Sequence, residues 1–195
     1  MGSFNAKEQI MNEKRIVKIA EDEVKKFAKE WKKNPYLWES EADIHAELYN
    51  RIKNCIDKPS EYKYDDMEKA GKFNWIYCKP KTYLKGKRNC YYPDIVIYKK
   101  GSKIRKVSER QNEPMLWVCE IKYITNWSSL LSKESVENDI RKLTCLLNQK
   151  RDGAERSYYL IFHRKVPLAK NIKKILKNMD ERIKPFIYPE DVDEK

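Results

Sequence analysis

Residues 115–124, MLWVCEIKYI, form a stretch that is apolar except at Glu120 and Lys122. Its β-branched and aromatic residues predict a strand, and its nearly continuous apolar character is typical of a strand covered on both faces. Side chains alternate between the two faces of a strand, so Glu120 and Lys122 point to the same side. Because burying unpaired charge is costly, these two residues indicate either a mutual ion pair or a bound cation.

The rest of the chain supplies further strands and the helices that would cover them. Strands are predicted at 73–78, 94–98 and 157–163. Apolar residues at helical spacing predict helices at 6–31, 40–55, 135–148 and 168–179. The core order is therefore α-β-β-β-α-β, with an extra helix at each end. We expect an α/β fold in which a mixed central sheet is flanked by helices.

The predicted elements suit a single domain with a helix added at each end. We expect one domain over residues 1–195, made of an N-terminal helical extension at 1–33, a core at 38–165, and a C-terminal helix and tail at 166–195. The polar segment 59–71 is expected to be a loop.

The first predicted helix carries apolar residues at seven-residue steps, namely Ile10, Val17, Val24 and Trp31. This spacing is typical of a helix that packs along one stripe. Packing on the domain's own core is the favoured interpretation, and a homodimer seam is the alternative.

Composition narrows the classes of protein that fit. The chain has 195 residues with 42 Lys+Arg and 30 Asp+Glu, a formal net charge of +12, which favours a polyanionic partner such as nucleic acid. No apolar run approaches the ~20 residues of a membrane span, and the polar start does not resemble a secretory signal. The 5 cysteines include no Cys-x-x-Cys pair, which speaks against a zinc ribbon. We expect a cytoplasmic protein without a membrane partner.

A third charge stands at the start of the strand that precedes 115–124. This residue is Asp94, and a hairpin pairing of the two strands would bring it next to Glu120. Two converging carboxylates are hard oxygen ligands of the kind that Mg²⁺ accepts. A lysine beside such a site, here Lys122, can orient a metal-bound water or offset charge on a phosphate.

Pro93-Asp94 followed by Glu120-x-Lys122 resembles the signature of the PD-(D/E)XK, or restriction endonuclease-like, phosphodiesterase superfamily. Members share an α-β-β-β-α-β core. The resemblance implies metal-dependent hydrolysis of phosphodiester bonds in nucleic acid. It implies Asp94 and Glu120 as ligands of Mg²⁺ or Mn²⁺, the Ile121 carbonyl as a further ligand, and Lys122 as the catalytic lysine.

The superfamily often adds a glutamate from the helix that precedes the first strand. Glu41 projects from the middle of that helix's apolar face and is preferred, while Glu47 at its margin is the reserve. A solvated or capping carboxylate is the alternative for either residue. Some RNA endonucleases of the superfamily use a helix histidine as a manganese ligand. His45 lies one turn after Glu41, but its spacing places it at the edge of the face, and we do not expect it to be a ligand.

The helix that follows 115–124 carries Asp139 and Lys142 beside its apolar stripe, within reach of the site. A solvated face with an i,i+3 pair between these two residues is the favoured interpretation.

Two basic clusters flank the Asp94 strand. Their members include Lys85, Lys87, Arg88, Lys99, Lys100, Lys103, Arg105 and Lys106. Cationic loops beside a metal site favour a phosphate backbone through counterion release. The sequence therefore predicts a Mg²⁺- or Mn²⁺-dependent endonuclease, with DNA favoured over RNA. A catalytically inactive nucleic-acid-binding or assembly protein of the same fold is the alternative.

Overall fold

The computed structural model describes residues 6–56, 60–62, 71–73, 76–80, 82–83, 90–99, 114–125, 131–149, 153–164 and 168–188. The helices among them are α1 (Ala6–Lys33), α2 (Glu41–Ile56), α3 (Lys133–Leu147) and α4 (Lys170–Lys177). The main sheet holds, in spatial order, β3 (Ile76–Cys78), β6 (Ile95–Tyr98), β7 (Met115–Ile124), β8 (Ser157–His163) and β9 (Ile183–Tyr188). Two short hairpins pair β1 (Ser60–Tyr62) with β2 (Gly71–Phe73), and β4 (Thr82–Tyr83) with β5 (Cys90–Tyr91).

The main sheet is mixed, as the sequence predicts. Strand β6 runs antiparallel to both of its neighbours, β3 and β7, whereas β7, β8 and β9 run parallel to one another. Parallel neighbours need a crossover connection, and α3 makes the one between β7 and β8. The predicted α/β class with a mixed central sheet is therefore confirmed.

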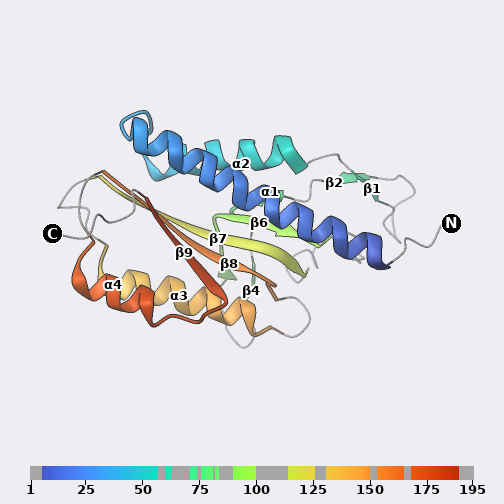
Figure 1. Cartoon of the computed structure of the whole chain (residues 1–195). Coiled ribbons are helices and arrows are strands. Elements are labelled where there is room, and N and C mark those ends of the chain that lie inside the picture. The colour runs from blue at the N-terminus through green and yellow to red at the C-terminus, as the bar shows by residue number, and fades with distance from the viewer. Residues whose placement is uncertain are drawn as a thin grey trace.

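Helices cover both faces of this sheet, with α1 and α2 on one face and α3 and α4 on the other (Figure 1). Successive side chains of β7 point to opposite faces of the sheet and pack in two separate hydrophobic clusters. Trp117 and Ile121 pack in the cluster that contains α1 and α2, whereas Val118 and Ile124 pack in the cluster that contains α3 and α4. By this alternation, Glu120 and Lys122 belong to the α3 side.

Helix α1 contributes buried side chains to the hydrophobic core between the sheet and α2. Val17, Val24 and Trp31 of the seven-residue stripe are buried against the chain's own sheet and α2, while the side chain of Ile10 lies outside the described residues. The predicted extension at 1–33 thus shares a hydrophobic cluster with the strands. The described part of the stripe packs within the molecule. None of the described helices is long and apolar enough to cross a membrane.

The C-terminal part differs from the prediction of a helix followed by a tail. Residues Ile183–Tyr188 form β9 at the edge of the main sheet. Only Ile183 of this strand is buried, and Pro185 lacks an N–H donor, which an edge strand tolerates. These two features hid the strand from hydrophobic periodicity. Residues 189–195 lie outside the described residues.

Two local expectations also need correction. The predicted loop at 59–71 contains β1 and the start of β2, which are too short to give a periodic signal. Helical spacing predicts Cys55 on the same face of α2 as Ile44, Leu48 and Ile52, but its side chain is exposed and lies beside Glu23 of α1.

Candidate metal centre

The first turn of α2 is fixed by a capping arrangement. The Asp43 carboxylate accepts a hydrogen bond from the Ser40 backbone N–H at 2.8 Å, and the Asp43 N–H donates to Ser40 Oγ at 3.2 Å. Hydrogen bonds from the Ser40 side chain and backbone lower the pKa of Asp43. This turn carries Glu41, and His45 follows one turn later on the same side of the helix.

The loop before α2 is fastened to the ends of two central strands. The Trp38 carbonyl accepts a hydrogen bond from Tyr123 Oη at 2.8 Å and from Arg164 Nη2 at 2.6 Å. Arg164 also donates to the Pro35 carbonyl at 3.2 Å. These bonds hold the N-terminus of α2 beside β7.

Glu41, His45 and Asp94 converge between α2 and the start of β6. One ligand atom from each lies within 4.8 Å of the others. His45 and Asp94 are only 3% and 4% exposed, and His45 Nε2 lies 3.0 Å from Asp94 Oδ2. Despite this distance, His45 Nε2 has no hydrogen-bond partner among the described residues. Neighbouring ligands of a divalent cation, each ~2.1 Å from it, are themselves ~3 Å apart, so this geometry fits a shared ion.

His45 is the ligand candidate that sequence reasoning set aside. Helical spacing placed it at the edge of the apolar face of α2, and the structure buries that edge against Asp94. The sheet covers a wider strip of α2 than the apolar residues mark, since α2 contacts both β3 and β7. The one-turn spacing from Glu41 was the signal that could have identified it.

Asp94 is tied to β7 by its backbone and its side chain. Its N–H donates to the Cys119 carbonyl at 3.1 Å, and its Oδ2 accepts from the Ile121 N–H at 2.7 Å. The pairing of Ile95 with Cys119, continued by one residue, places Asp94 opposite Glu120. The hairpin pairing thus brings Asp94 near enough to Glu120 for their charges to repel, although Glu120 is not among the clustered ligand atoms. The expected role of the Ile121 carbonyl as a metal ligand stays a prediction.

Glu120 is held on both of its oxygens. Tyr91 Oη donates to Oε2 at 2.7 Å, and Lys122 Nζ donates to Oε1 at 3.3 Å. Burial, followed by repulsion from Asp94, raises the pKa of Glu120 to about 7. A cation between Glu120 and Asp94 would remove that repulsion.

Lys122 is flanked by a second carboxylate from α3. Its Nζ lies 3.0 Å from Asp139 Oδ2, and Lys142 Nζ lies 3.0 Å from Asp139 Oδ1. Burial alone would lower the pKa of Lys122, but attraction by Glu120 and Asp139 raises it. The predicted i,i+3 pair between Asp139 and Lys142 forms, but the prediction of a solvated face is wrong, because Asp139 is only 4% exposed. Asp139 is buried because α3 packs on the sheet with this residue turned toward Lys122 of β7.

Glu47, the reserve ligand, lies in a different contact. It accepts a hydrogen bond from Arg51 Nε at 2.6 Å, and Arg51 also bonds to Glu30 on α1. Glu47 thus helps to join the two helices and is not among the clustered ligand atoms. Of the two candidates, the structure brings Glu41 to Asp94.

Few of the predicted nucleic-acid contacts can be placed. Lys99 forms an ion pair with Glu155. Lys79, which directly follows β3, lies 3.9 Å from Asp94 Oδ1. The other predicted contacts lie outside the described residues: Lys85, Lys87, Arg88, Lys100, Lys103, Arg105 and Lys106.

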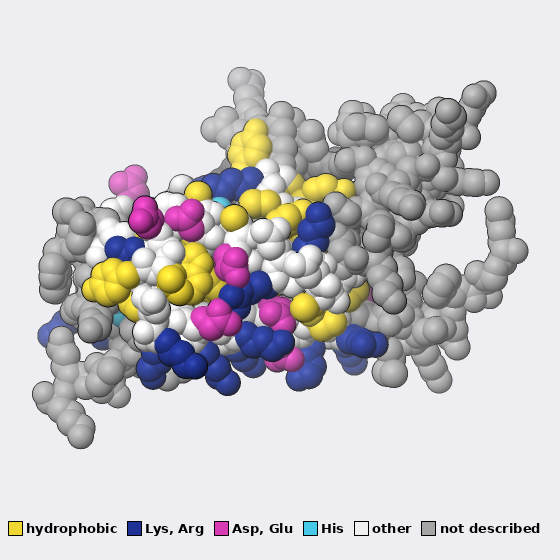
Figure 2. Space-filling view, turned by 90° about the horizontal axis from the view of Figure 1, so that it is seen from above, with side chains coloured by type: hydrophobic (Ala, Val, Ile, Leu, Met, Phe, Trp, Pro, Cys, Tyr) yellow, Lys and Arg dark blue, Asp and Glu magenta, His cyan; other side chains and the backbone are white. Residues whose placement is uncertain are grey.

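A basic surface that the sequence did not single out lies on α1. Figure 2 views the molecule from the side of α1 and α2, and Lys and Arg side chains lie along the lower edge of this view, over α1. Its exposed basic residues are Lys14, Arg15, Lys18, Lys25, Lys26, Lys29, Lys32 and Lys33. Lys18 and Lys26 have acidic partners on the same helix, Asp22 and Glu23.

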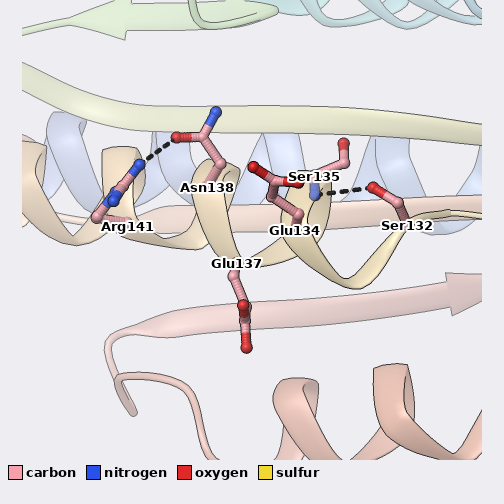
Figure 3. A pocket seen from close by; sticks show the side chains of 6 residues that line it. All are labelled: Ser132, Glu134, Ser135, Glu137, Asn138 and Arg141. Atoms are coloured by element: carbon pink, nitrogen blue, oxygen red, sulfur yellow. Dashed lines mark hydrogen bonds between the residues drawn. The ribbon is translucent and has the colours of Figure 1, made fainter.

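A surface pocket of about 620 Å³ lies along the first turns of α3 (Figure 3). It is lined by Ser132, Glu134, Ser135, Glu137, Asn138 and Arg141. Ser132 caps the helix, since its Oγ accepts from the Ser135 N–H at 3.0 Å, and Arg141 donates to Asn138 at 2.7 Å. The pocket contains none of the predicted site residues, so the cluster between α2 and the start of β6 remains the candidate site.

Several ionisable groups therefore meet at the junction of α2, β6, β7 and α3. Comparisons with protein-family models, curated proteins and solved structures found no match. A functional assignment accordingly depends on the chemistry of this junction: carboxylates and an imidazole that suit a divalent cation, next to an ammonium group.

Proposed function

We propose that the chain is a nuclease that uses Mn²⁺ or Mg²⁺ to hydrolyse phosphodiester bonds in nucleic acid, with DNA favoured over RNA. The observation that carries this proposal is the convergence of the half-buried Glu41 with the buried His45 and Asp94, with Glu120 and Lys122 nearby. The resemblance to the restriction endonuclease-like superfamily supports it. Pro93-Asp94 leads into β6, Glu120-x-Lys122 lies within β7, and α2 precedes both strands.

Glu41, His45, Asp94 and Glu120 would hold the cation, which supplies Lewis acidity and a more acidic bound water. Lys122 would donate a hydrogen bond to a phosphate oxygen of the substrate. Its raised pKa keeps it protonated, which suits charge stabilisation rather than proton abstraction.

The ligand set also bears on the choice of metal. Mg²⁺ prefers oxygen ligands almost exclusively, whereas Mn²⁺ accepts an imidazole more readily. With His45 in the set, Mn²⁺ should support faster cleavage than Mg²⁺ at equal concentration.

The test is cleavage of supercoiled plasmid, single-stranded DNA and RNA of one sequence, in Mn²⁺, in Mg²⁺ and in EDTA. The wild type should cut only with metal, and Asp94→Asn and Lys122→Met should retain less than roughly 1% of its rate. Equal cutting by wild type and Asp94→Asn would assign the activity to a contaminant and reject the proposal. Retarded migration of DNA without cleavage in either metal would favour the inactive nucleic-acid-binding protein.

A further inference from the structure

Five side chains beside the proposed metal centre form a closed ring of contacts, which we call the lysine clamp. Glu120 Oε1 accepts from Lys122 Nζ at 3.3 Å, and the same nitrogen lies 3.0 Å from Asp139 Oδ2. Asp139 Oδ1 lies 3.0 Å from Lys142 Nζ, which sits 5.2 Å from the centre of the Tyr91 ring. Tyr91 Oη returns to Glu120 Oε2 at 2.7 Å. The clamp thus uses both oxygens of both carboxylates.

An ion pair for Lys122 would not require Asp139. Lys122 already has Glu120 as a partner, two residues away on the same strand. Asp139 comes from α3, is 4% exposed, and brings a second buried negative charge that itself needs Lys142. Sequence-local pairing accounts for Glu120 and Lys122, but not for the carboxylate that α3 inserts from outside.

The added contact changes what the ammonium can do. An ammonium on a flexible four-carbon chain swings widely when it has one anchor. Glu120 holds it from β7 and Asp139 holds it from α3, so the position of Nζ is set by two elements. The contact with Glu120 is a hydrogen bond, whereas Asp139 Oδ2 holds the ammonium as an ion pair and has no hydrogen-bond partner among the described residues. Since an ammonium has three N–H donors, donors remain for a further acceptor.

We infer that Asp139 is a positioning residue, which holds the Lys122 ammonium where it meets a phosphate oxygen of the substrate, while Lys142 balances the charge of Asp139. This inference rests on the proposed function, because Lys122 acts on substrate there. The alternative is that Asp139 only joins α3 to the sheet. A joining role would alter stability and binding, whereas a positioning role alters the turnover of bound substrate.

The experiment compares Asp139→Asn with Glu137→Gln, a matched loss of one carboxylate from the exposed side of the same helix. Asp139→Asn should lower kcat for a plasmid or oligonucleotide substrate by about 10- to 100-fold, with KM and Mn²⁺ affinity within about threefold of wild type. Glu137→Gln should leave all three unchanged.

A second measurement follows the ammonium itself, without activity. In ¹⁵N-lysine-labelled protein free of metal, the Lys122 ammonium should give an NMR signal that is identified by its loss in Lys122→Met. That signal should broaden or vanish in Asp139→Asn and persist in Glu137→Gln.

An unchanged kcat or an unchanged ammonium signal in folded Asp139→Asn would overturn the inference. If Asp139→Asn does not fold, Lys142→Gln replaces it, with an expected kcat loss of about 3- to 10-fold. No loss in that variant would also overturn the inference. A wild type that cleaves nothing, with an ammonium signal that still depends on Asp139, would reject the proposed function while supporting the clamp.

Discussion

At the scale of single residues, the centre is defined by groups whose charges are held close together in a largely buried space. Asp94 and Glu120 repel each other, and each is anchored by a donor: the Ile121 N–H for Asp94 and the Tyr91 hydroxyl for Glu120. The Lys122 ammonium offsets part of this repulsion, and a bound cation would offset more of it. The local energetics therefore agree with metal binding.

The two candidate glutamates of α2 can be separated by calorimetry with Mn²⁺. Glu41→Gln and His45→Asn should each weaken binding by roughly tenfold or more, because each removes a clustered ligand atom. Glu47→Gln should bind Mn²⁺ as the wild type does, since its carboxylate pairs with Arg51 instead. Loss of affinity in Glu47→Gln alone would move the centre to the other side of α2.

The raised pKa of Glu120 predicts that the stability of the metal-free protein depends on pH. Its pKa is about 7 in the fold against an ordinary value of 4.5, so the fold favours the protonated form. The resulting stabilisation is present below about pH 4.5 and is lost as the pH rises through 7, an effect of up to about 3 kcal/mol. Urea unfolding in EDTA should show this decline.

The comparison variant for that series is Glu120→Gln, which keeps an acceptor for Tyr91 but has no proton to lose. Its free energy of unfolding should vary less between pH 5 and pH 8 than that of the wild type. Parallel pH curves for the two proteins would show that Glu120 is not the group responsible.

At the scale of elements, α1 and α2 act as a framework that fixes the centre against the sheet. Phe27 of α1 is fully buried, with ring centroids 4.7 Å from Trp38 and 5.1 Å from Phe162. Trp38 in turn lies in the loop that Tyr123 and Arg164 fasten to the strands. The aromatic core thus holds the start of α2, and with it Glu41.

Removal of one of these rings tests whether α1 packs on its own chain. Phe27→Ala should lower the free energy of unfolding by about 3–5 kcal/mol, because it leaves a cavity among aromatic rings. Lys25→Ala, on the exposed side, should change it by less than about 0.5 kcal/mol. Light scattering should give the same mass for both variants and the wild type. A change in mass with Phe27→Ala would point to the dimer seam.

Much of this framework could be predicted from the sequence, because long periodic segments such as α1, α3 and β7 show directly which side chains are buried. The motif likewise identified Asp94, Glu120 and Lys122 as neighbours. His45 and Asp139 could not be assigned in this way, since their burial depends on how α2 and α3 dock. Strand β9 also gave no signal, because an edge strand with a proline and one buried residue lacks a period.

At the scale of the whole molecule, the centre lies where the two layers of helices meet at the sheet. The proposed ligands come from α2, from the residue before β6 and from β7, and the clamp adds α3. Ion binding at such a junction should couple to global stability, because the unfolded chain does not hold these groups together.

Mn²⁺ should therefore raise the Tm of the wild type, by several degrees at millimolar concentration and pH 8. The rise in Tm should be smaller at pH 5.5, because protons then compete with Mn²⁺ for the Glu120 carboxylate. Asp94→Asn should show little rise at either pH in differential scanning fluorimetry. An equal rise in Asp94→Asn would mean that Mn²⁺ acts elsewhere on the protein.

The crossover between β7 and β8 has a consequence for the order in which the molecule matures. A ribosome makes Glu120 and Lys122 before α3 and β8, so a growing chain exposes one side of β7 until its later half emerges. Asp139 reaches the lysine only when that half has wrapped around the sheet. A polypeptide that stops before α3 would thus lack a complete centre, and competence would arrive only after that helix has been made.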